Sequence, residues 1–198
     1  IRWQYERVVL REPFHLSYPQ VFRWKDCYYM LPETRAASAV RLYRARRFPD
    51  QWEFAGELLN GPYADPTVVQ HDGRWWLFAY ARDDSLSLFY APEPTGPWTM
   101  HPCSPIVTGS RTISRPAGRI VHHEGALLRY AQDGTSGYGG ALRVVQIDRM
   151  TTSEYAEHEV PDSPIFGATG KGWNADGMHH ADTHRLGEND WIACVDGN

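Results

Sequence analysis

The chain has 198 residues, of which 13% are aromatic, and its formal net charge is −4. Acidic and basic residues are mixed along the sequence without a basic tract, which argues against a nucleic-acid partner. No stretch approaches the ~18 consecutive apolar residues that predict a membrane span.

The three cysteines lie far apart and form no CxxC pair; they are Cys27, Cys103 and Cys194. This spacing favours isolated, mostly buried thiols over a disulfide or a zinc site. Unpaired thiols and the lack of a visible signal peptide slightly favour a cytoplasmic location.

A repeat of about 47 to 50 residues runs along the whole chain. Residues 18–30 align without a gap on residues 65–77, and the pattern of residues 42–52 recurs at 88–98. Repeats of this length that consist of short strands are typical of β-propeller blades. The sequence therefore predicts an all-β propeller that forms a single domain.

The first predicted element is an outer strand within residues 1–12. Residues 3–10 repeat the aromatic and apolar pattern of residues 52–59, which is predicted to be the outer strand of the following blade. The first three strands of the preceding blade are then absent. This strand either completes the final half-blade of a closed four-bladed ring or belongs to a five-bladed propeller of which one blade is mostly missing.

The remaining blades follow in order. Each is predicted to open its innermost strand at a polar-Pro pair, and a charged turn then leads into a second strand that is aromatic and apolar. The turn at Asp72-Gly73 between two alternating apolar segments is typical of a hairpin. Full blades are predicted at residues 13–60, 61–110 and 111–165, and the first half of the last blade at 175–198.

Propeller geometry brings polar residues of different blades to one end of the central axis. The first two strands of a blade are antiparallel, so the start of the first and the end of the second share one rim. Several carboxylates at one mouth are suited to glycosidic bond hydrolysis, in which one acid protonates the leaving oxygen and another activates water or attacks. The residues predicted to meet there are Tyr18, Glu33, Asp65, Asp83, Arg115, Gln132, Asp133, His180 and Asp196.

The leading hypothesis is a glycoside-hydrolase-like protein with Asp65 and Glu33 as the carboxylate pair and Asp133 as a pKa-tuning or substitute acid. Each residue also has a structural interpretation, because an acid before proline can set a turn and an arginine can pair with a neighbouring acid. The predicted substrate-binding residues are Tyr18, Arg115, Arg119, Gln132, His179, His180 and Asp182.

His180, Asp182 and His184 would share one face of a strand, and two histidines with a carboxylate can bind a metal. Neighbours on one face of a strand are ~7 Å apart along the chain, however, so the three side chains rarely reach one ion. We expect structural or sugar-binding histidines and no cofactor, with a metal near His180 or at the axis as the less favoured alternative.

These motifs, in this order and over essentially the whole chain, resemble the N-terminal domain of the plant glucosamine inositolphosphorylceramide transferase family and its bacterial relatives. That domain is in turn similar to the five-bladed propellers of arabinanases, levansucrases and invertases, including glycoside hydrolase family 43. The resemblance therefore implies a five-bladed propeller and a preceding blade. The motifs include Glu12-Pro-Phe-His-Leu-Ser-Tyr-Pro19, Met30-Leu-Pro-Glu-Thr34, Arg115-Pro-Ala-Gly-Arg119 and Gly177-Met-His-His180.

The resemblance carries function less far than fold. In family 43 glycosidases three blades supply a base, a pKa-tuning acid and a general acid, and Asp65-Pro66 matches such an opening. The blades on either side open at Tyr18 and Arg115, so the succession of acids is broken. In the plant enzyme, glycosyl transfer is implied to belong to a separate C-terminal domain.

Two further hypotheses therefore stand beside hydrolysis. One is a non-catalytic glycan-binding or accessory domain that supports a glycosyltransferase or another partner enzyme. The other is a propeller that serves only as a scaffold for protein partners. A propeller fold is compatible with all three functions.

Overall fold

A computed structural model describes residues 4–197, which form four β-sheets and two short 3₁₀ turns, η1 (Arg35–Ala37) and η2 (Gly172–Asn174). The first sheet contains β1 (Ser17–Trp24), β2 (Cys27–Glu33), β3 (Ala39–Arg47) and β4 (Gln51–Asn60). The second contains β5 (Ala64–His71), β6 (Arg74–Ala81), β7 (Ser85–Ala91) and β8 (Thr99–Met100). The third contains β9 (Arg115–Pro116), β10 (Val121–His123), β11 (Ala126–Asp133), β12 (Ala141–Met150), β13 (Tyr155–Glu159) and β14 (Phe166–Gly167). The fourth is the hairpin of β15 (Ala181–Arg185) and β16 (Trp191–Val195).

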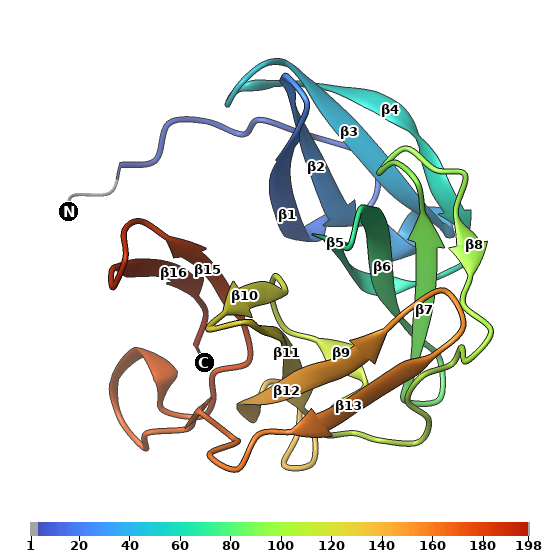
Figure 1. The fold of residues 1–198 in the computed structure, drawn as a ribbon. Coiled ribbons are helices and arrows are strands. Elements are labelled where there is room, and N and C mark those ends of the chain that lie inside the picture. Colours follow the sequence, from blue (N-terminus) through green and yellow to red (C-terminus); the bar gives the residue numbers. More distant parts are fainter. Residues whose placement is uncertain (1–3, 198) are drawn as a thin grey trace.

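The sheets stand around a central axis, with their first strands innermost (Figure 1). Successive strands within each sheet pair antiparallel, and the chain passes from one sheet to the next through loops. This arrangement confirms the predicted all-β propeller class. The number of blades in the complete ring stays a prediction.

Successive blades are held together by apolar cores between their faces. Neighbouring residues of β6 point to opposite sides of the sheet, so Trp75 and Leu77 pack toward the first sheet while Trp76 and Phe78 pack toward the third. A strand that is buried on both faces reads as a continuous apolar segment rather than an alternating one. The continuous apolar sequence of β6 is therefore explained by the position of its sheet between two other blades.

The predicted hairpin turn between β5 and β6 is confirmed. Asp72 and Gly73 have φ angles of 48° and 72°, which are the two positive values that a type I′ turn requires. Glu124 and Gly125 form the corresponding turn between β10 and β11, with φ angles of 50° and 81°. Local turn chemistry thus determines the register of both inner hairpins.

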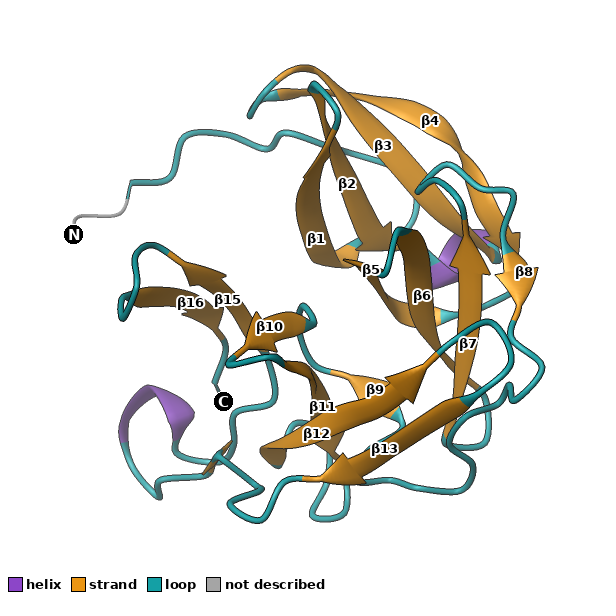
Figure 2. Ribbon diagram, in the orientation of Figure 1, coloured by secondary structure: helices purple, strands orange, loops and turns teal. Residues whose placement is uncertain are grey.

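The start of the chain differs from the prediction. Residues 4–16 form no strand, whereas an outer strand was expected within residues 1–12; Trp3 of that motif lies outside the described residues. An isolated strand leaves its amide and carbonyl groups unpaired, and no strand among residues 4–197 pairs with this segment. Figure 2 shows the segment as an extended loop that leaves the first sheet.

The cysteines also differ in part from the prediction. All three are free thiols, as expected, but Cys103 and Cys194 are exposed and Cys27 is only partly buried. Among residues 4–197, no helix has the length and apolar character needed to cross a membrane.

Candidate functional site

Two inner strands open with the same backbone irregularity. Tyr18 and Asp65 each precede a proline and have φ angles of 49° and 47°, and the strand register shifts immediately after each of them. A bulge of this kind re-aims a side chain, and a positive φ at a residue other than glycine marks a position that the surrounding structure imposes. The repeat thus directs one side chain of each blade toward the axis.

Tyr18 connects the blades rather than lining a cleft. Its hydroxyl lies 2.9 Å from Oγ1 of Thr67, accepts a 2.6 Å hydrogen bond from the Gly118 amide and lies 3.2 Å from the Gly118 carbonyl. The ring also meets His180 edge-on, with 5.1 Å between the centroids. Burial raises the pKa of Tyr18 well above its usual range, so it remains a neutral phenol.

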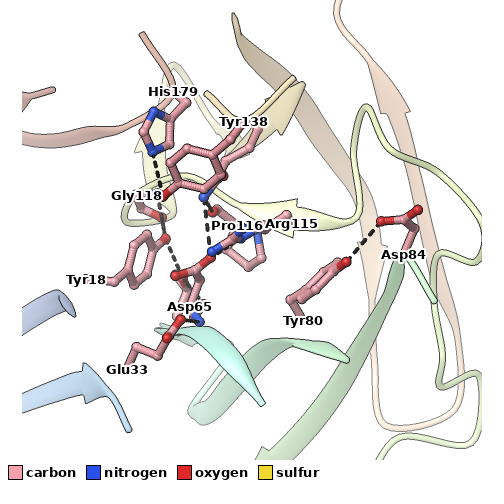
Figure 3. Close-up of polar contacts among 12 residues, drawn as sticks. Tyr18, Glu33, Asp65, Tyr80, Asp84, Arg115, Pro116, Gly118, Tyr138 and His179 are labelled. Carbon is pink, nitrogen blue, oxygen red and sulfur yellow. Dashed lines mark hydrogen bonds and ion pairs between the residues drawn. The ribbon is translucent and has the colours of Figure 1, made fainter. Parts of the chain in front are cut away.

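Asp65 and Glu33, the predicted carboxylate pair, lie next to each other (Figure 3). Asp65 is buried, and its Oδ2 accepts hydrogen bonds from Nε of Arg115 at 2.5 Å and Nε2 of Gln132 at 3.3 Å. The Glu33 carboxylate accepts a 3.1 Å hydrogen bond from the backbone amide of Asp65. Both acids are therefore engaged by the protein itself.

Burial raises the pKa of the Asp65 carboxyl; Arg115 opposes this shift, and the neighbouring Glu33 adds to it. Removing a charge from water is costly even beside a guanidinium, because the pair gains only part of the hydration energy that it loses. The folded protein thus binds a proton at Asp65 more tightly than the unfolded chain does.

Replacing Asp65 with asparagine is therefore expected to reduce the pH dependence of stability. Because the pKa is raised on folding, the wild-type free energy of unfolding should fall as the pH rises above about 4, the usual Asp pKa. Asparagine has no proton to lose, so the variant should show a smaller fall. Urea unfolding at pH 5 and pH 8 measures both differences, and an equal fall in the two proteins would contradict the assigned shift.

The other predicted acids are also bound by the protein. Asp133 accepts hydrogen bonds from Thr135 at 2.5 and 2.9 Å and from Nε of Arg143 at 2.6 Å. Although burial alone would raise it, these contacts lower the pKa of Asp133. Asp83 is exposed in the turn after β6, and it is the neighbouring Asp84 that turns inward and accepts a 2.9 Å bond from the Tyr80 hydroxyl.

Asp182 belongs to an ion pair. Nε and Nη2 of Arg119 donate to its two oxygens at 2.5 and 3.0 Å, and Nε2 of His184 lies 3.2 Å from Oδ2. Among residues 4–197, no group of three or more His, Cys, Asp or Glu side chains could hold a metal ion. His180 was considered as a metal ligand together with Asp182 and His184, but its ring packs against Tyr18.

A cleft of about 220 Å³ opens beside the Asp65–Arg115 pair. The Arg115 guanidinium carbon lies 5.6 Å from the ring centroid of Tyr80 and 5.3 Å from that of Tyr138, so the cation stacks near two aromatic rings (Figure 3). The cleft is lined by Tyr80, Asp84, Arg111, Ser114, Arg115, Gln132, Gly134, Gly137, Tyr138 and Gly139.

Tyr138 projects from the glycine-rich loop between β11 and β12 and is linked to the last hairpin. Its hydroxyl lies 3.2 Å from Nε2 of His179, and burial lowers the pKa of this histidine despite the nearby Asp196. The lowered pKa favours the neutral imidazole, and the tautomer of this ring decides which of the two groups donates the hydrogen bond. Nδ1 lies 2.9 Å from Oδ2 of Asp196, at an angle outside hydrogen-bonding geometry, while Oδ1 of that acid accepts bonds from the amides of His179 and His180.

Gly139 allows this arrangement. A Cβ atom at this position would lie 2.6 Å from Nδ1 of His179, and the φ angle of 75° is one that other residues rarely adopt. The loop can therefore approach the histidine closely only with glycine here. His179, which the sequence predicts to bind substrate, borders the cleft through Tyr138.

Sequence reasoning identified Arg115 and Gln132 but missed the other residues that line the cleft, among them Tyr80, Asp84, Arg111 and Tyr138. Tyr138 carried a signal, because an aromatic residue within a glycine-rich segment at a strand end is typical of a binding loop. Arg111 had none, because it lies in an irregular segment whose path depends on the rest of the blade.

The fold and the cleft define a class. It is an all-β propeller with a cleft lined by aromatic and arginine side chains beside its inner strands. Two of the solved structures with a similar fold are glycoside hydrolases. A GH43_1 enzyme from Xanthomonas citri complexed with xylotriose matches with a TM-score of 0.56 and 16% identity, covering 77% of this chain and 57% of its own. A family 117 glycoside hydrolase from Zobellia galactanivorans matches with a TM-score of 0.60 and 13% identity, covering 91% of this chain and 66% of its own.

The sequence matches the family described as glucosamine inositolphosphorylceramide transferase 1, N-terminal, over residues 1–198. Glucosamine inositolphosphorylceramide transferase 1 of Oryza sativa subsp. japonica is 35% identical over 207 residues, and that of Arabidopsis thaliana is 36% identical over 205. The chain belongs to this family. Each match covers 99% of this chain but only 28% of the rice protein and 27% of the Arabidopsis protein. Both of these relatives are plant proteins.

Proposed function

We propose that this chain is a non-catalytic glycan-recognition domain that presents an anionic sugar headgroup to a glycosyltransferase. The observation that carries the proposal is the ion pair between Asp65 and Arg115, in which Nε of Arg115 donates to Oδ2 of Asp65 at 2.5 Å. The guanidinium lines the cleft in place of the carboxylate. A ligand in this cleft meets a cation and aromatic rings rather than a catalytic acid.

The engagement of the acids favours recognition over hydrolysis. Glycosidic hydrolysis needs two carboxyl groups that face the scissile bond, one as acid and one as base or nucleophile. Instead, an arginine pairs with each of the three acids Asp65, Asp133 and Asp182. Glu33 accepts a hydrogen bond from the backbone amide of Asp65. Acids held in this way orient neighbouring groups and would have to break these bonds before reacting.

The chemistry of the cleft favours a polyhydroxylated anion. Tyr80 and Tyr138 line the cleft with aromatic rings and hydroxyls. Arg111 is exposed and has no ion-pair partner among residues 4–197, so its charge is available to a phosphate or carboxylate. The plant relatives are named for an inositolphosphorylceramide, whose inositol phosphate group combines hydroxyls with negative charge.

Calorimetric titration with myo-inositol 1-phosphate and with neutral myo-inositol tests the proposal. We expect the phosphate to bind more tightly, and Tyr138→Ala to weaken that binding about tenfold or more because Tyr138 is an aromatic residue that lines the cleft. Tyr5→Ala is the matched control, since Tyr5 is 78% exposed and lies outside the cleft. Equal affinities for the two ligands would contradict anion recognition.

A parallel assay separates recognition from catalysis. The wild-type protein and Asp65→Asn are incubated with pentoside, hexoside and aminosugar glycosides, and release of the aglycone is followed. We expect no turnover by either protein. Turnover that disappears in Asp65→Asn would instead establish the hydrolase hypothesis and place Asp65 in its machinery.

A further inference from the structure

Exposed apolar side chains gather on one segment between the third and fourth sheets. Residues 165–173, which we call the rim segment, include Ile165, Phe166 and Trp173, all of them exposed. Phe166 is 50% exposed and Trp173 is 62% exposed. Apolar surface in water is unfavourable, and exposed apolar residues that lie together mark interaction sites more often than single ones do. The rim segment is therefore a candidate contact surface.

Hydrogen bonds hold the second half of the rim segment in a compact turn around η2. The backbone amides of Thr169 and Gly170 donate to the carbonyl oxygens of Asn174 and Ala175 at 3.1 and 3.0 Å. Trp173 belongs to η2 itself. These bonds satisfy backbone groups within the turn, which lowers the cost of bringing it into an apolar medium.

The rim segment lies at the same end of the axis as the cleft. Phe166 of β14 pairs with Leu142 of β12, and β12 begins directly after the loop that carries Tyr138. Trp173 packs on the end of the last hairpin, since a Cβ atom at Gly197 would lie 2.5 Å from Cε3 of its ring. Figure 2 shows η2 beside this end of the chain. Both aromatic residues thus border the entrance of the cleft.

This entrance also carries an amphipathic ring and unpaired cations. Tyr138 lines the cleft and is nevertheless exposed. Arg82, which follows β6, Arg111 and Lys171 are exposed, and none of these three cations has an ion-pair partner among residues 4–197. Tyrosine and tryptophan favour the boundary between water and lipid, because each has an apolar body and a polar tip. Lysine and arginine at this boundary are attracted to anionic lipids.

The ligand proposed above limits what this end of the molecule can meet. The inference rests on that proposed function, the recognition of an anionic sugar headgroup. A headgroup is attached to a lipid, and the polar layer of a bilayer is only roughly 5–8 Å thick on each side. A cleft that takes the headgroup without extracting the lipid must therefore have its entrance against the bilayer surface.

We propose that the rim segment and Tyr138 form a membrane-docking surface, which rests on an anionic bilayer while the cleft holds a headgroup. Phe166 and Trp173 insert between the lipids at the interface, and the unpaired cations contact lipid phosphates. The partner is a lipid surface because exposed aromatic rings and unpaired cations together surround the entrance of a headgroup cleft. This combination is complementary to the apolar and anionic layers of such a bilayer.

Flotation with vesicles of phosphatidylcholine and phosphatidylinositol tests the docking surface. The wild type is compared with the rim variant, Phe166→Ala/Trp173→Ala, and with the control variant Phe54→Ala/Leu186→Ala. The control residues are similarly exposed, at 54% and 67%, but lie outside the rim segment and the cleft. We expect the rim variant to bind vesicles about tenfold or more weakly than the other two proteins, because membrane binding scales with the apolar area inserted.

Calorimetric titration with myo-inositol 1-phosphate separates docking from headgroup recognition. All three proteins should bind this soluble ligand equally, because neither pair of substitutions changes a residue that lines the cleft. No binding of the soluble ligand by the wild type would contradict the proposed function. Equal vesicle binding by the wild type and the rim variant, or no vesicle binding by a wild type that binds the soluble ligand, would overturn the docking surface.

Fluorescence quenching locates Trp173 in the bound state. Phosphatidylcholine that carries bromine atoms on its acyl chains quenches tryptophans that reach the lipid. Trp173→Phe keeps an aromatic ring at this position, so it should still bind vesicles but lose most of the quenching that the wild type shows. Equal quenching in the two proteins would place Trp173 outside the bilayer and overturn the proposal.

Discussion

Replacing Arg115 with alanine is expected to weaken the binding of myo-inositol 1-phosphate about 10- to 100-fold. A hydrogen bond to a charged group contributes about 1.5–3 kcal/mol, and Arg115 is the cation that stacks between Tyr80 and Tyr138 in the cleft. Arg115→Lys keeps the charge but loses the planar guanidinium, so it should recover only part of the affinity. Calorimetric titration of the three proteins measures the effect.

The same substitution also removes the partner of a buried acid. Without Arg115, the Asp65 carboxyl stays buried and loses the group that opposes the rise of its pKa, so the variant should be less stable than the wild type above neutral pH. The double variant Arg115→Ala/Asp65→Asn separates the two effects. It should regain stability but not affinity, and recovery of affinity in this protein would show that Arg115 does not contact the ligand.

Replacing Arg129 with methionine is expected to lower the free energy of unfolding by about 3–5 kcal/mol, the usual cost of removing one partner of a buried ion pair. The Arg129 side chain is only 3% exposed and that of Glu157 only 9%. The guanidinium donates to the two Glu157 oxygens at 2.6 and 2.5 Å and to the carbonyl oxygen of Ile113 at 2.8 Å. Methionine fills a similar volume but leaves the Glu157 charge without its partner.

Urea unfolding monitored by tryptophan fluorescence measures this loss. Arg149→Met is the matched control, because Arg149 and Glu154 form a pair whose side chains are 60% and 59% exposed, and such pairs contribute little. Similar losses in the two variants would contradict the assigned role. Since Arg129 also holds Ile113, close to Ser114 and Arg115 of the cleft, the variant should bind ligand more weakly even under conditions where it remains folded.

Much of the fold could be predicted because its determinants are local. The alternation of side chains along a strand and the chemistry of a two-residue turn act within a few residues, so β5, the Asp72-Gly73 turn and β6 were recognisable from the repeat alone. The prediction of an outer strand within residues 1–12 failed because strand formation also depends on contacts that are not local. A strand needs a neighbour, and an outer-strand pattern does not say whether the rest of its blade is present.

The candidate site was predictable only in part. The repeat indicated which positions reach the axis, and Asp65, Glu33, Arg115 and Gln132 do meet there. Their hydrogen-bond and ion-pair partners were not predictable, because the Asp65–Arg115 contact joins residues 50 positions apart and the Tyr18–Gly118 contact joins residues 100 apart. Tertiary contacts of this kind decide whether a carboxylate faces ligand or an arginine.

The sequence by itself determined the all-β propeller class and the inner hairpins, because period-two patterning and positive-φ turns encode them locally. Only the tertiary structure decided that Tyr18 ties the blades together, that Arg115 rather than Asp65 lines the cleft, and that Tyr138 lines this cleft while its hydroxyl contacts His179. The physical reason is that a buried charge must find its partner in space, and propeller closure brings together blades that are distant in the chain.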